Sequence, residues 1–155
     1  MSNIAKSKEL LKRYSIARIP FIAINTIERA RTLDILKEIS EELTLPFYVH
    51  TLSKGTYDLA TEKIINDDKS VYGALDFMSE QMKRKQYMTL ILTEVPDLST
   101  DNSDSKQILD LVTLANESGG VIIVLTNNAV WNQLQRQGMV IKVDLPNEEE
   151  MYTII

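Results

Sequence analysis

The chain has 155 residues, of which 44% are apolar and 25% are charged, the composition of one ordinary globular domain. Its 17 Lys and Arg face 22 Asp and Glu, so the net charge of −5 makes nucleic acid an unlikely partner. The chain lacks cysteine and has a single histidine, which excludes disulfides and thiolate zinc sites and leaves little for a histidine metal site or a Ser-His-Asp triad. No metal site is expected.

The first third of the chain alternates between helix and strand patterns. Residues 4–14 predict an amphipathic helix rich in Lys and Glu, and the β-branched apolar run 19–25 predicts a buried strand. Thr26 is expected to cap an amphipathic helix of about four turns that ends near residue 43. Residues 47–50 predict a second short strand.

The remaining chain continues the alternation. Residues 51–69 are polar, with a possible helix at Leu59–Ile65, and Ser70 is expected to cap the helix that follows. A polar loop is predicted at 97–106, then a helix that Gly119-Gly120 ends, and later a short helix over 130–137. Three more mainly apolar runs predict strands; they span 88–92, 121–125 and 139–143. The continuous apolarity of 88–92 suggests burial on both faces, as in a parallel sheet covered by helices.

This order predicts an α/β fold, a three-layer, doubly wound, mostly parallel five-stranded sheet in one domain over residues 1–155. Apolar runs are far shorter than the ~20 residues that span a bilayer, and no targeting segment is visible, so a cytoplasmic location and no membrane partner are expected. Asn147 is predicted to start a helix that stops on Ile154-Ile155. We therefore expect the domain to be the N-terminal part of a longer protein.

Open parallel sheets bind ligands at the carboxyl ends of their strands. After the first strand, a phosphate-binding loop would need the pattern G-x-x-x-x-G-K-[ST], because phosphate approaches the backbone closely there. The chain has no glycine before Gly55, so this loop is missing. The helix start with Arg29 or Arg31 can still hold an anion weakly, or these arginines can simply be solvated.

The third and fourth predicted strands end in further candidates. Glu94 follows the third strand, where P-loop ATPases place a carboxylate that works with Mg²⁺ and water, although acidic residues also occur at strand ends by chance. Asn127 follows the fourth strand, and its amide can orient a phosphate or serve as a turn residue. His50 is expected to be a partly buried, hydrogen-bonded histidine, and Asp101 and Asp104 to belong to a flexible loop without the glycine of a calcium site.

A resemblance to the AAA-family ATPases appears in residues 119–155, which read GGVIIVLTNNAVWNQLQRQGMVIKVDLPNEEEMYTII. The segment resembles the stretch from the sensor-1 strand through the arginine-finger turn to the first lid helix. The resemblance implies that Asn127 matches the sensor-1 Asn, that Arg136 lies close to the finger position, and that residues 145–149 begin the lid. A solvated surface position is the alternative for Arg136.

Two upstream segments, ARIPFIAINTIERARTLDILKEISEELTLPFYVH and GALDFM, are similar to the N-terminal region of the plastid and cyanobacterial reading-frame AAA ATPases. In that family an inactive AAA-like domain without a P-loop precedes the active one. The resemblance implies an AAA α/β core whose helical lid is absent or only begun.

The leading hypothesis is a catalytically inactive AAA-like domain that lacks a phosphate-binding loop and acts as an interaction or regulatory module of a larger ATPase. ATP and Mg²⁺ are then cofactors of the full-length protein, and the partners are other proteins or further copies of the chain. The alternative is an unconventional NTPase that uses the turn at Thr26–Arg31, with Thr26, Asn127 and Arg136 as candidate cofactor ligands and Glu94 as the candidate catalytic residue. A receiver-like domain ranks last, and strand order separates it: 2-1-3-4-5 against the AAA order 5-1-4-3-2.

Overall fold

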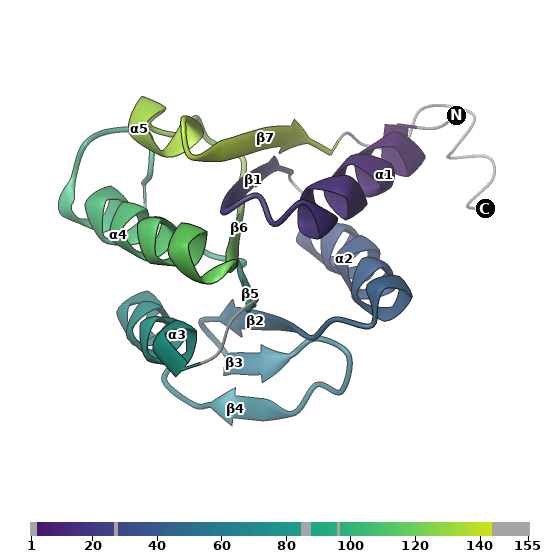
Figure 1. Cartoon of the computed structure of the whole chain (residues 1–155), viewed down its shortest axis with the longest axis horizontal. Helices are drawn as coiled ribbons and strands as arrows, with labels where there is room; N and C mark the ends of the chain where they lie inside the picture. The colour runs from purple at the N-terminus through teal and green to yellow at the C-terminus, as the bar shows by residue number, and fades with distance from the viewer. Residues whose placement is uncertain (1–2, 27, 85–87, 96, 144–155) are drawn as a thin grey trace.

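The computed structural model describes residues 3–26, 28–84, 88–95 and 97–143. Helices and strands alternate along the chain except where β2, β3 and β4 follow one another (Figure 1). In chain order they are α1 (Asn3–Ile16), β1 (Phe21–Asn25), α2 (Arg29–Leu43), β2 (Phe47–Thr51), β3 (Gly55–Asp58), β4 (Ile64–Asn66), α3 (Val71–Arg84), β5 (Thr89–Leu92), α4 (Ser103–Ser118), β6 (Val121–Thr126), α5 (Asn132–Gln135) and β7 (Gly138–Lys142).

The strands form one sheet in the order β4-β3-β2-β5-β6-β1-β7. The pairs β2–β5, β5–β6, β6–β1 and β1–β7 are parallel, whereas β3 pairs antiparallel with both β2 and β4. The five parallel strands are the five that the sequence predicts. Numbered along the chain, they follow the order 5-1-4-3-2, which confirms the AAA-like fold class and excludes the receiver-like order.

Helices cover both faces of the sheet (Figure 1), with α1 and α2 on one side and α3, α4 and α5 on the other. Strand β6 shows how the two cores are built. Its Ile122 and Val124 belong to the core under α3 and α4, whereas Ile123 and Leu125 belong to the core under α1 and α2. Because successive strand side chains point to opposite faces, a continuous aliphatic run is what a doubly covered strand requires.

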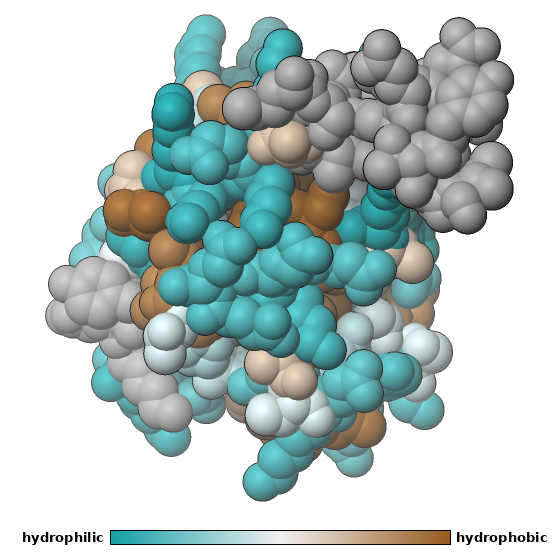
Figure 2. Space-filling view, turned by 90° about the vertical axis from the view of Figure 1, so that its right-hand side faces the viewer, coloured by the Kyte–Doolittle hydropathy of each residue, from teal (hydrophilic) through white to brown (hydrophobic). Residues whose placement is uncertain are grey.

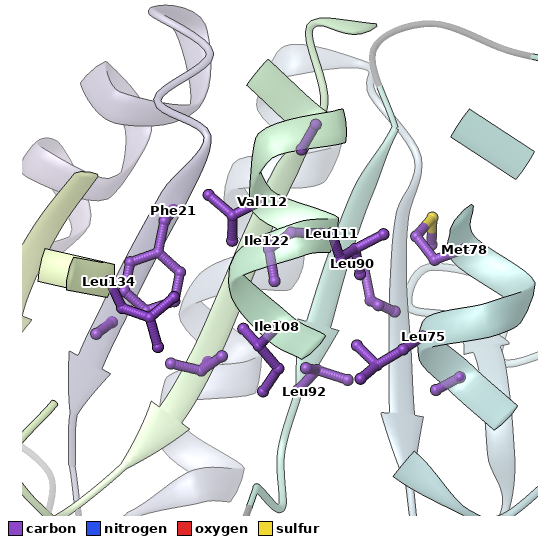
Figure 3. Close-up of a cluster of buried hydrophobic side chains, with 14 of the residues drawn as sticks. Phe21, Leu75, Met78, Leu90, Leu92, Ile108, Leu111, Val112, Ile122 and Leu134 are labelled. Atoms are coloured by element: carbon purple, nitrogen blue, oxygen red, sulfur yellow. The ribbon is translucent and has the colours of Figure 1, made fainter. Parts of the chain in front are cut away.

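The core under α3 and α4 is the one that supports the candidate site. Figure 3 shows Leu75 of α3, Leu92 of β5 and Ile108 of α4 next to one another, and all three belong to the same buried cluster. By contrast, the outward face of α1 and α2 is mainly hydrophilic (Figure 2). There Lys8 of α1 binds both Glu38 and Glu42 of α2, at 3.1 and 2.8 Å.

The helix predicted at Leu59–Ile65 is wrong, because this region forms the β3–β4 hairpin that widens the sheet from five to seven strands. Ile64 and Ile65 of β4 are 51% and 38% exposed, so the edge strand lacks the alternation that marks a half-buried strand. Gly55 begins β3 at φ +82, and a Cβ there would lie 2.4 Å from the Asn66 carbonyl oxygen.

The predicted boundaries of α3 and α4 are only partly correct. Ser70 caps α3 as expected, since its Oγ accepts a 2.9 Å hydrogen bond from the Gly73 N–H. Gly119 ends α4 in the left-handed conformation, also as expected. However, α4 begins at Ser103 and takes up the end of the predicted loop, because Asn102 forms a capping box with Ser105.

The predicted helix at Asn147 and the lid match at 145–149 lie outside the described residues. Among the helices that the structure does describe, none has the length and apolar character needed to cross a membrane.

Candidate functional site

Two of the predicted site residues meet at the carboxyl edge of the parallel strands. Thr26 follows β1 and Asn127 follows β6, and both line a polar pocket of about 440 Å³. Arg29, at the start of α2, and Val95, after β5, also line this pocket. The pocket therefore lies where α/β sheets bind ligands.

The connection from β1 to α2 is short and internally hydrogen-bonded. Only residues 26–28 lie between the end of β1 and the start of α2. The buried Thr26 Oγ1 accepts a 3.0 Å hydrogen bond from the Glu28 N–H, and its backbone N–H donates to the Thr126 carbonyl at 2.9 Å. The predicted capping role of Thr26 is wrong, because Glu28 occupies the N-cap position of α2 and the Thr26 hydroxyl closes the turn instead.

Carboxylates neutralise both arginines at this edge. The Glu28 carboxylate lies 3.7 Å from the Arg31 guanidinium, and the Glu94 carboxylate lies 3.9 Å from the Arg29 guanidinium. Glu94 also accepts a 3.3 Å hydrogen bond from the Leu52 N–H, which ties the end of β5 to the turn after β2. Each arginine predicted to hold an anion is therefore already paired with a carboxylate.

Asn127 is exposed in the turn that follows β6, and the neighbouring Asn128 N–H donates to the Thr126 hydroxyl at 3.1 Å. Asn127 lines the polar pocket, so both interpretations of this residue, phosphate orientation and turn formation, fit its position.

Arg136 lies near the amino-terminal ends of the parallel strands, opposite the polar pocket at their carboxyl ends. It ends α5 just before β7, and the first residue of β7, Gly138, pairs with Phe21 at the amino end of β1. Its side chain is exposed and lines neither the polar pocket nor the apolar pocket described next. The structure thus separates Arg136 from Thr26, Asn127 and Glu94, and within one chain it cannot share a ligand with them.

A second, mainly apolar pocket of about 420 Å³ adjoins the polar one and shares Val95 with it. It lies between the N-terminal ends of α3 and α4, where the Tyr72 hydroxyl donates a hydrogen bond to the Asp104 carboxylate. This hydrogen bond raises the pKa of Tyr72. Glu94 lines this second pocket and not the polar one. The sequence did not reveal the second pocket. The signal it offered was the aromatic residue Tyr72, three positions before Leu75, and both residues line the pocket.

His50 is completely buried, not partly buried as predicted. Its Nε2 lies 3.2 Å from the Asp68 carbonyl oxygen, whereas Nδ1 has no hydrogen-bond partner among the described residues. Burial lowers the pKa of His50. No group of three or more His, Cys, Asp or Glu suited to a metal ion occurs in the described part of the chain.

The comparisons with known proteins agree with this fold. A family profile described as the N-terminal domain of SpoVK-like AAA ATPases matches residues 7–143. The chain belongs to this family. The match covers every described strand and most of α1, so the family assignment rests on the whole sheet and not on one motif. It confirms the resemblance to AAA-family ATPases and to an N-terminal domain of such a protein. No curated protein and no solved structure matches the chain.

Proposed function

We propose that this chain is an AAA-like domain that has lost the phosphate-binding site and serves an AAA ATPase as an interaction or regulatory module. Membership of the family supports an AAA-like domain that serves an AAA ATPase, since members of the family are N-terminal domains of AAA ATPases. The local geometry after β1 supports the loss of the phosphate-binding site.

The observation that carries the proposal is the three-residue connection between β1 and α2. A P-loop places four residues between two glycines and then a Lys, so that successive backbone N–H groups surround the phosphates. Here the connection is residues 26–28, its Glu28 N–H is bonded to Thr26, and the carboxylate of Glu28 stands at the positive end of α2. A phosphate at this helix end would meet the paired Glu28 and Arg31 side chains instead of a free Lys.

Without that cradle, two contributions to ATP hydrolysis are lost. The backbone amides and Lys normally bind the β- and γ-phosphates, and the same groups stabilise charge that develops in the transition state. Arg29 does not replace them, because the Glu94 carboxylate already compensates its charge. We therefore expect the module to act by binding other proteins or further copies of the chain at its surface, and not by hydrolysing ATP.

The test is Mg-ATP turnover by the purified chain. We expect phosphate release at the rate of the buffer blank, with no change on adding a second nucleotide such as Mg-GTP. Turnover at the rates of ordinary ATPases, about 1 per second or faster, would overturn the proposal.

One observation favours the unconventional NTPase as a second candidate: Thr26, Arg29 and Asn127 line one polar pocket, and Glu94, which lines the adjoining pocket, pairs with Arg29 at 3.9 Å. This candidate predicts that Glu94→Gln abolishes any turnover that the chain shows, because the general base would be lost. Glu117→Gln is the matched control, since Glu117 is an exposed carboxylate near the end of α4. Equal turnover in both variants would remove this candidate.

A further inference from the structure

A groove runs between α3 and α4, which cover the face of the sheet opposite α1 and α2 (Figure 1). The apolar pocket at their N-terminal ends is followed by a smaller hollow of about 140 Å³ further along the same two helices. The two cavities share Leu75 of α3 and Gln107 of α4, so they adjoin along the same pair of helices and are together called the groove. Its floor is aliphatic, since Leu75, Ile108 and Leu111 belong to the core beneath it.

The groove is acidic along its whole length. Asp104 and Glu94, the latter paired with Arg29, line the pocket, and Asp76 and Asp110 line the hollow, whereas no Lys or Arg is among the described residues that line either cavity. The tyrosine at the mouth, Tyr72, bonds to one of these carboxylates and so leaves its charge in place. An apolar floor between carboxylates selects for apolar side chains flanked by cations.

Apolar side chains at the mouth of the groove are left uncovered. Tyr72 and Leu52 both line the pocket, and they are 53% and 47% exposed. Tyrosine is enriched among the residues that dominate binding energy at interfaces, because it offers a large rigid surface with a polar end. Covering these two side chains would remove apolar surface from water without breaking any contact of the fold.

We propose that the α3–α4 groove docks a basic amphipathic helix of a partner protein, with its aliphatic side chains on the groove floor and its Lys or Arg beside the carboxylates. The inference rests on the proposed role as an interaction module. From Asp104 to Leu114 the groove follows about three turns of α4, or about 15 Å, so it fits a partner helix of about three turns. A symmetric dimer through this groove is disfavoured, because it would place the four carboxylates of each copy against each other.

The probe is a fluorescein-labelled synthetic peptide of about 14 residues, with Leu at helical i, i+3, i+4, i+7 spacing and Lys at the other positions. Its binding to the 155-residue chain is followed by fluorescence anisotropy at near-physiological salt. We expect saturable binding that the double variant Asp76→Lys/Asp110→Lys weakens about tenfold or more. Tyr72→Ala is expected to weaken binding about fivefold or more, since it removes the exposed anchor.

The matched control is the double variant Asp34→Lys/Glu41→Lys. It makes the same charge change at exposed positions of α2, on the other face of the sheet, and is expected to keep the wild-type affinity within about twofold. A peptide with Glu in place of every Lys is expected not to bind. Amide chemical-shift changes on adding the Lys peptide are expected on α3 and α4.

Several results would overturn the proposal: no binding of the Lys peptide, equal loss in both double variants, or shift changes confined to other elements. A dimer in sedimentation velocity that Asp76→Lys/Asp110→Lys dissolves would also overturn it, because the occupant would then be a second copy. The two proposals fail separately. Loss of peptide binding without ATP turnover removes only the groove assignment, whereas ATP turnover with intact peptide binding removes only the loss of the phosphate site.

Discussion

Asn102→Ala tests how the start of α4, one wall of the groove, is held in place. The Asn102 side chain accepts a 2.9 Å hydrogen bond from the Ser105 N–H and donates a 2.9 Å hydrogen bond to the Asp97 carbonyl. Loss of an N-cap side chain costs about 1 kcal/mol, and loss of the second hydrogen bond costs about 1 kcal/mol more. We therefore expect the free energy of unfolding to fall by about 2 kcal/mol, which lowers Tm by about 4–8 °C in a domain of this size.

Two companion variants separate this effect from a general change in α4. Asn116→Ala makes the same substitution at an exposed position inside the helix, and it is expected to leave stability equal or slightly higher, because Ala is the better helix former. Asn102→Asp keeps the capping oxygen but loses the donor to Asp97, so about half of the loss is expected. Urea unfolding by circular dichroism measures all three. Equal stability of Asn102→Ala and Asn116→Ala would refute the reasoning.

Three further predictions concern the sheet, the buried histidine and the turn after α1. Gly138→Ala would place a Cβ 1.7 Å from the Phe21 carbonyl oxygen, so we expect a loss of about 3 kcal/mol or more by urea unfolding, and a wild-type midpoint would contradict the β1–β7 contact. Burial lowers the pKa of His50 below its ordinary 6.5, so the contribution of the neutral ring to stability should be fully present above about pH 6.5 and fall as the pH drops toward the folded pKa. His50→Gln should flatten this dependence of the free energy of unfolding on pH, and an equal dependence in both proteins would contradict the reasoning. Arg18→Ala removes donors to the Gly119 and Met88 carbonyls, at 2.7 and 3.2 Å, and should lower the free energy of unfolding by about 2 kcal/mol, whereas exposed Arg13→Ala should change it by less than about 0.5 kcal/mol.

Strands β1, β5 and β6 could be predicted because burial on both faces leaves a direct trace in the sequence. Residues 121–125 are all aliphatic, and every one of them is buried in the structure. The β3–β4 hairpin leaves no such trace, since Ile64 and Ile65 lie exposed at the edge of the sheet. Its pairing depends on contact with β2, which no local pattern encodes.

The start of α4 could not be placed for a different physical reason. Five consecutive side chains are all capable of capping a helix, namely those of Ser99, Thr100, Asp101, Asn102 and Ser103. Asn102 is selected because Ser105 can complete a reciprocal capping box and because Asp97 accepts from its amide. Both partners are known only when the loop has folded.

The candidate site was predictable where it depended on strand order. Thr26 and Asn127 follow neighbouring parallel strands, so their meeting at one edge follows from the topology. The carboxylate of Glu28 at the start of α2 and the contact between Tyr72 and Asp104 depend on where helices begin and how they pack. Such details are set by tertiary structure and are the least readable part of a sequence.

The most direct test of the proposed loss of the phosphate site is a calorimetric titration of the chain with Mg-ATP. The three-residue β1–α2 connection and its Glu28 carboxylate predict no saturable heat up to about 1 mM nucleotide. Stoichiometric binding in the micromolar range, accompanied by turnover, would contradict the central claim.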